Sequence, residues 1–540
     1  MNNSGLQGML KDGYKHLSGL EEAVIKNIEA CKALSQLTRT SLGPHGMNKM
    51  VINHLERLFV TSDAATILNE LEVQHPAAKL VALAAKSQQE ELGDGTNLVV
   101  SLAGELMSHA DELIREGLHP SEIIEGYAKA SEKVLQLLPT LVLPGSEKID
   151  VKNETEVAAA LKASVAAKQY GYEDLLAPLV AKACIEVCPP NPNNFNVDNV
   201  RVCKVTGGGI HQSAVVNGLV IKRDTEGTVK SATDAKVAVY ADAVDTLSTE
   251  TKGTVLIENA EQLETYSKSE EDKMEAYIKG IADAGAKVVV SGGSFGEMAL
   301  HFIERYGLLA VKIVSKFELR RFCRATGAVG LVKAEPPSAD ELGYIKDIRV
   351  EEYGDTLVTV IRQDEKVSKI ATLLLRASTD NMLDNIERAL DDGVNSYKIL
   401  TRDPRRLPAG GATELELARL LSEFGKKETG LDQYAVKKFA TALEIVPRIL
   451  CENAGMNPEQ ILPQLYTAHA SGSATIGVDI EENGVKDLTP DGYSDLYDVK
   501  YWAIKLCVDA VVTVLRVDQI IMAKQAGGPK TANKPAMDED

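Results

Sequence analysis

The chain has 540 residues, of which 44% are hydrophobic and 25% are charged, and this balance is typical of a globular protein with roughly three or four domains. The formal net charge of −19 argues against a nucleic-acid binder and against a protein that docks on an anionic membrane. No apolar run reaches about 18 residues, so we expect no membrane span.

The N-terminal stretch MNNSGLQGMLKDGYKHL lacks the apolar core of a secretory signal. The seven cysteines have no framework spacing, and reduced cysteines suit a cytoplasmic protein, which is the location we expect. Cys184 and Cys188 lie four residues apart on a predicted helix. A zinc pair is one interpretation, but two buried thiols are the favoured one.

The first part of the chain, about residues 1–145, is predicted to be helical. Apolar residues recur at helical spacing from Leu20 to Leu37. Ser18 and Glu21 form a possible capping box before this helix, and Gly43 with Pro44 ends it. Three more helices are predicted: one from Pro76, one from the end of LGDGTN to about Gly117, and one from about Pro120 to Leu138.

The middle of the chain alternates between strand and helix patterns. VRVCKVTGGGIHQSAVVNGLVIKR indicates strands around a glycine-rich hinge or hairpin. The following stretches predict strand TVLIEN, helix 260–284, strand AKVVVSGG, helix SFGEMALHFIERYG, strand LAVKIV and helix SKFELRRFCRATGA. This alternation indicates an α/β domain with parallel strand pairing over about residues 214–367.

After strand IATLLLRAS the helices return, at 380–400, at 413–424 and in YDVKYWAIKLCVDAVVTVLRVDQII. The order helical, α/β, helical is compatible with three successive domains or with one helical domain interrupted by insertions. The small, polar, proline-bearing residues 527–540 are expected to form a disordered tail.

The stretch LGDGTN (Leu92 to Asn97) combines two glycines with a carboxylate at the start of a helix. The glycines permit positive φ angles and a close approach to the backbone, and the free N–H groups of the helix start favour an anion. Asp94 alone would repel a phosphate, but Mg²⁺ binds one or two carboxylates together with phosphate oxygens. A plain Gly-Asp-Gly turn with a cap is the alternative.

Four other stretches carry similar features. SLGPHGMNKM places Gly43 and Gly46 after a helix, and VTSDAATIL places Asp63 at a strand-to-helix turn, where an aspartate usually caps the helix. LPAGGATELELA leads from Gly411 into a helix, and ERALDDGV puts Asp391 and Asp392 on one. Adjacent acids usually form a solvated face, but one that points inward could orient a water. No P-loop, catalytic Ser-His-Asp set or histidine metal cluster is present.

These five stretches occur in the order SLGPHGMNKM, VTSDAATIL, LGDGTN, ERALDDGV and LPAGGATELELA, and together they resemble the group II chaperonins over about residues 15–527. Within that group the chain resembles subunits of the eukaryotic cytosolic chaperonin CCT (TRiC). The resemblance implies an α/β multidomain fold. It favours a helical equatorial ATPase domain at 1–145 and 404–526, a small intermediate domain at 146–213 and 368–403, and an apical domain with a helical protrusion at 214–367.

The resemblance also implies an ATP-dependent folding chaperone that uses ATP and Mg²⁺. Such a subunit would join seven paralogous subunits in each eight-membered ring of a double ring. It would enclose unfolded clients, with actin and tubulin expected from the family, and IENAEQLETYSKSEEDKMEAYIKGI resembles the lid protrusion. The alternative is a slow or non-hydrolysing structural subunit that contributes client or partner contacts.

Site residues follow from the same resemblance. Asp94 matches the Mg²⁺ ligand, and Asp63 and Asp392 match the acids that act on the attacking water. The nucleotide-binding positions are Gly43, Gly95, Thr96, Asn97, Lys168, Gly411 and Asp495. The client-binding helix would present Phe317, Arg320, Arg321, Phe322 and Arg324; ordinary α/β packing of this helix is the alternative.

The chain departs from the family pattern close to these positions. Asn97 stands where most members have threonine, and His45 where a lysine is common. Ala64 and Ala409 replace glycines, and alanines at 166 and 167 replace hydroxyl residues before Lys168. The three acids are kept, so hydrolysis is expected, and the departures are the reason for keeping the slow-subunit alternative.

Overall fold

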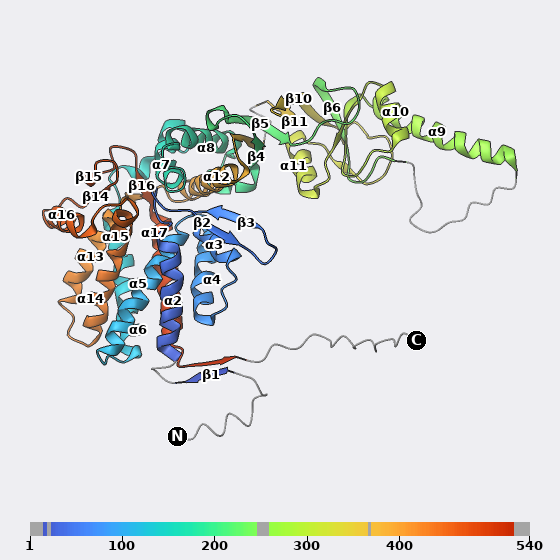
Figure 1. The fold of residues 1–540 in the computed structure, drawn as a ribbon. Helices are drawn as coiled ribbons and strands as arrows, with labels where there is room; N and C mark the ends of the chain where they lie inside the picture. The colour runs from blue at the N-terminus through green and yellow to red at the C-terminus, as the bar shows by residue number, and fades with distance from the viewer. Residues whose placement is uncertain (1–14, 19–22, 246–258, 365–368, 523–540) are drawn as a thin grey trace, which may run out of the picture.

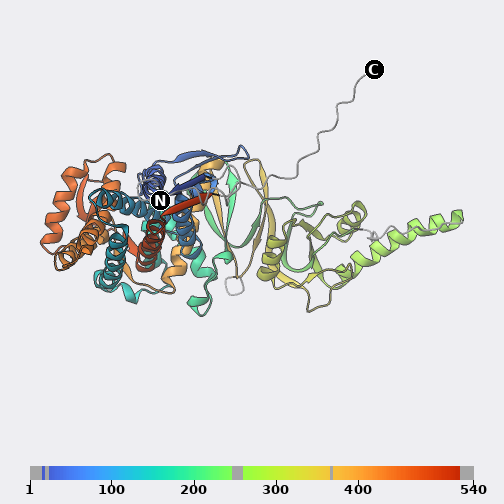
Figure 2. The same cartoon turned by 90° about the horizontal axis from the view of Figure 1, so that it is seen from below.

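The computed structural model describes residues 15–18, 23–245, 259–364 and 369–522. A helical body built from both ends of the chain is followed by a smaller layer around helices α7, α8 and α12. An α/β body lies beyond that layer, and its long helix α9 (Ala260–Asp283) projects away from it (Figures 1 and 2). The fold is therefore mixed and multidomain, as predicted, while the domain boundaries proposed from the sequence stay predictions.

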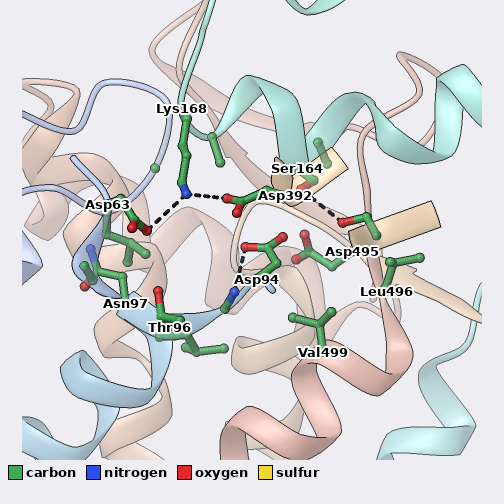
Figure 3. Close-up of a pocket in the computed structure, with 18 of the residues that line it drawn as sticks. Asp63, Asp94, Thr96, Asn97, Ser164, Lys168, Asp392, Asp495, Leu496 and Val499 are labelled. Carbon is green, nitrogen blue, oxygen red and sulfur yellow. Dashed lines mark hydrogen bonds and ion pairs between the residues drawn. The ribbon is translucent and has the colours of Figure 1, made fainter. Parts of the chain in front are cut away.

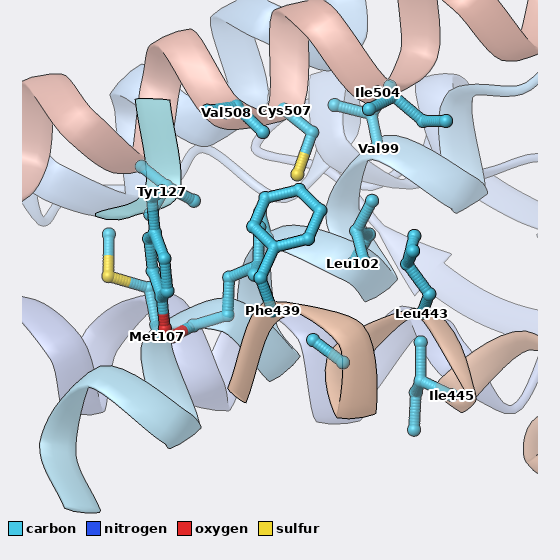
Figure 4. Close-up of a cluster of buried hydrophobic side chains, with 14 of the residues drawn as sticks. Val99, Leu102, Met107, Tyr127, Phe439, Leu443, Ile445, Ile504, Cys507 and Val508 are labelled. Atoms are coloured by element: carbon cyan, nitrogen blue, oxygen red, sulfur yellow. Dashed lines mark hydrogen bonds between the residues drawn. The ribbon is translucent and has the colours of Figure 1, made fainter. Parts of the chain in front are cut away.

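The helical body is held together by one apolar core. Its buried residues come from segments 24–138 and 407–515, so the two ends of the chain share one interior. Tyr127 and Phe439 pack edge to face at its centre, with ring centroids 5.7 Å apart (Figure 4). The helices are α2 (Ile25–Arg39), α3 (Ala64–Glu70), α4 (Pro76–Glu91), α5 (Thr96–Arg115), α6 (Pro120–Leu137), α13 (Ala412–Gly425), α14 (Asp432–Leu443), α15 (Ile445–Asn453), α16 (Pro458–Ala470) and α17 (Tyr497–Leu515).

Short strand pairs border this body. β1 (Lys15–Ser18) pairs with β17 (Gln519–Met522), and β2 (Lys49–Ile52) pairs with β3 (Leu58–Thr61). β13 (Arg406–Pro408) pairs with β16 (Ser494–Leu496), and β14 (Ile476–Asp479) pairs with β15 (Gly484–Asp487).

Two predictions about the chain ends are wrong. The last helix stops at Leu515, because the following segment pairs as β17 with β1 instead of continuing as helix. Ser18 belongs to β1, and α2 begins later, at Ile25, with no side-chain cap at Val24. The predicted capping box therefore does not start α2, and its other member, Glu21, lies outside the described residues.

The middle layer has its own core. α7 (Glu154–Ala166), α8 (Glu173–Val187) and α12 (Asp380–Leu400) pack together with one end of the large sheet. Leu161, Val180 and Leu390 are fully buried there. Because α12 comes from a distant part of the sequence, this layer is also built from two separate chain segments.

The large sheet has the strand order β4-β12-β5-β11-β10-β6-β7-β8, with β9 paired to β6. The pairs β6-β7 and β7-β8 are parallel, as the alternating pattern predicted, whereas β5, β11, β10 and β6 pair antiparallel. The strands are β4 (Val200–Thr206), β5 (Ala214–Ile221), β6 (Ser231–Tyr240), β7 (Ala286–Ser291), β8 (Leu309–Lys312), β9 (Gly330–Leu331), β10 (Gly343–Tyr353), β11 (Thr356–Arg362) and β12 (Ala371–Ala377).

The glycine-rich stretch between β4 and β5 is not a hairpin. β12 inserts between the two strands, parallel to β4 and antiparallel to β5. Helices α10 (Glu297–Arg305) and α11 (Lys316–Thr326) follow β7 and β8 as predicted. The predicted strand TVLIEN falls almost entirely outside the described residues.

The described part of the chain can be searched for metal-binding groups, disulfides and membrane-spanning helices. Within it, no three potential ligands among histidine, cysteine and acidic side chains gather into a metal-binding group, and all seven cysteines are free. Cys184 is buried but Cys188 is only half-buried, so one of the two thiols predicted to be buried is enclosed. No helix described here combines the length and apolar character needed to cross a bilayer.

Candidate functional site

Two adjoining cavities lie where the helical body meets the middle layer. The first, of about 170 Å³, is lined by the ends of α5 and α7, by α12 and by β16. The second, of about 460 Å³, is lined by the turn before α13 and by β14. Both contain Gly43, Asp495 and Lys500 in their walls, so they form one continuous hollow with an acidic end and a wider end.

The start of α5 forms the floor of the acidic end. Gly95 is the N-cap of α5 with φ = 79°, and its N–H donates to Asp94 Oδ1 over 2.6 Å. A Cβ at this position would lie 2.8 Å from Val499 Cγ1, so both conformation and space require glycine. Thr96 is buried beside it. The free N–H groups of the first helical turn, including that of Asn97, can therefore receive an anion here.

Lys168 joins the two predicted catalytic acids. Its Nζ lies 3.0 Å from Asp63 Oδ1 and 2.5 Å from Asp392 Oδ2. Figure 3 shows the three side chains, together with Asp94, pointing toward one another from separate elements. Asp63 also caps α3, since Thr66 N–H donates to its Oδ2 over 3.0 Å. Asp63 is therefore both the N-cap of α3 and a residue of the site.

Burial and mutual charge set the protonation of this group. Burial raises the pKa of Asp392 well above its usual range against the opposing effect of Lys168, and nearby Asp94 and Asp63 raise it further. Burial alone would lower the pKa of Lys168, but the charges of Asp392 and Asp63 raise it above its ordinary value. Burial would raise the pKa of Asp63, yet Lys168 and Thr66 keep it below its usual range. Within this pair the two shifts therefore run in opposite directions: the pKa of Asp63 is lowered and that of Asp392 is raised.

Asp392 also carries an unused acceptor. It is only 2% exposed, and its Oδ1 has no hydrogen-bond partner among the described residues. A buried carboxylate oxygen without a partner is costly unless a water or ion supplies one. Its neighbour Asp391 is exposed. Of the two adjacent acids, Asp392 is therefore the one that faces the cavity.

The wider end is built around Gly411 and Asp495. Gly411 is the N-cap of α13 with φ = 78°, and it lines this cavity with Gly410 and Val478. Asp495 lies in β16 and contacts Lys500 Nζ over 3.0 Å. Gly43, which follows α2, lines both cavities. All of the predicted nucleotide and metal positions therefore border the same hollow.

Sequence reasoning missed three polar residues of the site. Lys500 is buried and also pairs with Glu414 of α13. Ser164 and Ser396 line the acidic end, and the Ser396 hydroxyl donates to Ser164 Oγ over 3.1 Å. Ser164 precedes Lys168 by four residues and Ser396 follows Asp392 by four. Helical spacing from the predicted residues could have identified both.

Asn97 is used differently from the other predicted residues. Its Nδ2 donates to the Thr38 carbonyl and to Ser41 Oγ, each over 3.1 Å, and its Oδ1 accepts from Ser101. The amide thus holds the end of α2 and the turn toward Gly43. A contact between Asn97 and a ligand would have to come from its backbone N–H.

The predicted client-binding helix, α11, divides into two faces. Phe317 is 72% exposed and Arg320 and Arg324 are exposed as well, whereas Arg321 is half-buried. Phe322 is fully buried in the core of the sheet. Its side chain is not available to a client in this structure, because it packs with Leu319 on the inner face of the helix.

The donor set at the acidic end suits a divalent cation. Four carboxylates, Asp63, Asp94, Asp392 and Asp495, line it with only two lysines, 168 and 500, so negative charge exceeds positive charge by two. These acids do not gather into a group of three that could hold a metal by itself, but Mg²⁺ needs only one or two carboxylates together with phosphate oxygens, and Asp94 at the start of α5 fits that arrangement. The pKa of Asp94 is raised by its enclosure and by Asp495, and lowered by Lys168 and the Gly95 N–H, with a net rise. A bound cation would remove the repulsion between these acids.

Comparison with known proteins agrees with the fold. Residues 34–525 match the TCP-1/cpn60 chaperonin family. T-complex protein 1 subunit theta of Arabidopsis thaliana is 59% identical over 526 residues, which cover 97% of this chain and 96% of the relative. The theta subunit of Homo sapiens is 52% identical over 539 residues, covering 99% and 98%.

The theta subunit of Caenorhabditis briggsae is 49% identical over 538 residues, covering 99% of this chain and 98% of the relative. The sequence also resembles the theta subunit in particular, in the stretches DDGVNSYKI, KYWAIKL and VLRVDQIIMAKQAGGPK. These relatives confirm that resemblance. With matches that span almost its whole length, the chain belongs to the TCP-1/cpn60 chaperonin family.

Proposed function

We propose that this chain is an ATP-hydrolysing subunit of a hetero-oligomeric chaperonin. The main support is that three acids far apart in sequence line one cavity together with the start of α5. They are Asp63, Asp94 and Asp392. Within this proposal Asp94 would hold Mg²⁺, and the N–H groups of Thr96 and Asn97 would bind phosphate oxygens that approach closely over Gly95, whose own N–H donates to Asp94. Gly411 and Asp495 would face the sugar and base in the wider cavity.

The acids would act on the water that attacks ATP. The water oxygen forms a bond to the γ-phosphorus, and the bond from that phosphorus to the β–γ bridging oxygen breaks. Asp63 and Asp392 orient the water, and one of them accepts its proton. Lys168, which pairs with both acids here, would stabilise the negative charge on the γ-phosphate. Mg²⁺, when bound, would supply electrostatic stabilisation of the phosphate charge.

Two separate cores support coupling between hydrolysis and movement. Asp63 starts α3 beside the core of the helical body, whereas Asp392 lies on α12 within the core of the middle layer. A rigid movement of one core relative to the other would change the distance between the two acids. We propose that this movement is passed on to the α/β body and closes it over a client.

The remaining assignments belong to the same proposal. The units built from 1–145 with 404–526, from 146–213 with 368–403, and from 214–367 would be the equatorial, intermediate and apical domains. The relatives are named as subunits of T-complex protein 1, which supports assembly with other chains; we propose a double ring with eight paralogous chains in each ring. Exposed Phe317, Arg320 and Arg324 would contact unfolded clients such as actin and tubulin, in the cytoplasm.

The test measures nucleotide on this chain within assembled particles. Particles carrying a tagged copy are incubated with Mg²⁺ and 8-azido-ATP and irradiated, and the tagged chain is isolated for mass analysis of its adduct. Wild-type chain should carry a diphosphate adduct. Asp392→Asn should carry mainly triphosphate, because loss of an acid–base group slows turnover by about 10²-fold or more. Asp94→Ala should carry little label.

The neighbouring substitution Asp391→Asn is the matched control, since Asp391 is exposed, and it should behave as wild type. If the wild-type chain retains triphosphate, the proposal that this chain hydrolyses ATP is wrong, and the non-hydrolysing structural role is supported instead. An equal diphosphate share in wild type and Asp392→Asn would overturn the role of Asp392.

A further inference from the structure

A second buried ionic group lies behind the wide end of the cavity. His469, on α16, is 2% exposed. Its Nδ1 lies 2.8 Å from Glu416 Oε2, and its Nε2 lies 2.9 Å from the Ile476 carbonyl oxygen. Glu416 belongs to α13 and Ile476 begins β14. The imidazole therefore joins three elements that are separate in sequence.

Both partners of this ring accept hydrogen bonds. A carbonyl oxygen can only accept, and the Glu416 carboxylate is kept ionised by Arg419, whose Nε lies 3.1 Å from Glu416 Oε1. Burial would raise the pKa of Glu416, but hydrogen bonds from His469 and Arg419 lower it to about 2. A neutral imidazole has one N–H and would lose one of the two bonds. Both ring nitrogens of His469 thus face an acceptor.

The joined elements form the wall of the cavity. Val478 N–H donates to the Gly410 carbonyl over 2.9 Å. Gly477 packs so closely that a Cβ there would lie 2.7 Å from the Ala409 carbonyl oxygen. Gly410, Gly411 and Val478 all line the wide cavity. A closed path thus runs from Gly411 along α13 to Glu416, through His469 to Ile476, and back through Val478.

We infer that His469, through its contacts with Glu416 of α13 and the Ile476 carbonyl of β14, is a positioning residue that fixes β14 against the Gly410–Gly411 turn and so shapes the part of the cavity that receives the nucleoside of the nucleotide. This inference rests on the proposed function for the identity of the ligand. It does not depend on that function for the link between α13 and β14. His469 lies outside the walls of both cavities, so it acts through the backbone of β14.

The structure also provides room for a rescue variant. His469 borders a groove of about 260 Å³ whose other charged or titratable residues are Arg419, Glu423, Lys426, Glu444 and Tyr466. A longer side chain can extend toward this groove. His469→Arg can donate to two acceptors at once. His469→Gln is neutral, and its single amide nitrogen can serve only one side of the original pair well.

The experiment compares wild type, His469→Gln and His469→Arg in assembled particles, with His301→Gln as control because His301 is exposed on α10. In these particles the acid that corresponds to Asp392 is replaced in every other subunit, so that only this chain hydrolyses ATP. Steady-state hydrolysis then gives KM and kcat for this chain. We expect His469→Gln to raise KM about tenfold with kcat within twofold of wild type, and His469→Arg to return KM to within threefold. An unchanged KM in His469→Gln, or a kcat loss without a KM change, would overturn the inference.

Hydrogen exchange of nucleotide-free particles provides an independent readout. His469→Gln should speed amide exchange at 409–411 and 476–479 about tenfold while leaving α5 unchanged, and His469→Arg should restore slow exchange. Faster exchange throughout the chain would show a general loss of stability and overturn the positioning role. If wild-type chain binds no nucleotide, the proposed function fails, whereas the exchange result still decides the role of His469.

Discussion

The ammonium group of Lys168 lies 2.5 Å from Oδ2 of Asp392, although one residue follows α7 and the other lies in the middle of α12. The same ammonium group contacts Asp63 over 3.0 Å. This single cation therefore bridges acids from two separate cores. Its pairing keeps two carboxylates close together in a buried position where they would otherwise repel each other.

Removing this cation is expected to destabilise the chain. Lys168→Met leaves Asp63 and Asp392 facing each other without their shared partner, and breaking a buried pair in this way costs about 3–5 kcal/mol. Urea unfolding of the purified chain measures the change. Lys86→Met is the control, because its side chain is 52% exposed and its ion pair lies on the surface; its effect should stay within about 0.5 kcal/mol. Equal effects of the two substitutions would contradict the account.

Asn97 departs from the family pattern, but its side-chain amide is expected to stabilise the fold through its hydrogen bonds. Asn97→Ala removes the amide's bond to the Thr38 carbonyl, which keeps the Ser41 N–H and hydroxyl as donors, so the loss should cost about 0.5–1.5 kcal/mol. Asn97→Thr should also cost stability, because one hydroxyl hydrogen cannot replace both donations to Thr38 and Ser41. Thermal unfolding of the two variants checks this, with exposed Gln464→Ala as control. A more stable Asn97→Thr chain would refute the proposed role of the amide.

The two phenylalanines of α11 should separate client contact from folding. Phe322→Ala removes a fully buried ring and should cost about 3–5 kcal/mol. Phe317→Ala removes a ring that is 72% exposed, so stability should change by less than about 0.5 kcal/mol. Capture of denatured actin by assembled particles should fall in Phe317→Ala. Undiminished capture would exclude Phe317 from the client surface.

Acid should weaken the link made by Glu416. The pKa of this carboxyl falls from 4.5 to about 2 in the folded chain, so the unfolded chain takes up the proton first as the pH decreases. Its contribution, about 3 kcal/mol for this difference, is complete above pH 4.5 and is lost as the pH falls toward 2. Urea midpoints of wild type and Glu416→Gln between pH 7 and 3 check this. Their difference should shrink with acid, and a constant difference would contradict it.

Much of the fold was accessible from local patterns. The helices α5, α6 and α12 begin and end within about two residues of their predicted limits, because long apolar periodicity, an N-terminal proline and a glycine turn act locally. The pairing of β1 with β17 and the insertion of β12 between β4 and β5 were not predicted. Both depend on contacts between segments that are distant in sequence, and no local pattern encodes such pairing.

The candidate site divides in the same way. The motifs LGDGTN and ERALDDGV indicated Asp94 and Asp392, the family resemblance added Asp63, Lys168 and Asp495, and the structure brings all of them to one cavity. Lys500 was missed because a lone lysine on an apolar helix has no motif. Phe322 was assigned to the surface even though Leu319, three residues before it, marks the inner face of the same helix.

The most direct test of the central claim is a high-resolution structure of the assembled particle prepared with Mg²⁺ and a non-hydrolysable ATP analogue. We predict a triphosphate at the start of α5 with a metal ion on Asp94. The carboxyl groups of Asp63 and Asp392 should face the γ-phosphate, and the base should lie between Gly411 and β14. Nucleotide that is present in neighbouring chains but absent from this cavity, or bound elsewhere on this chain, would contradict it.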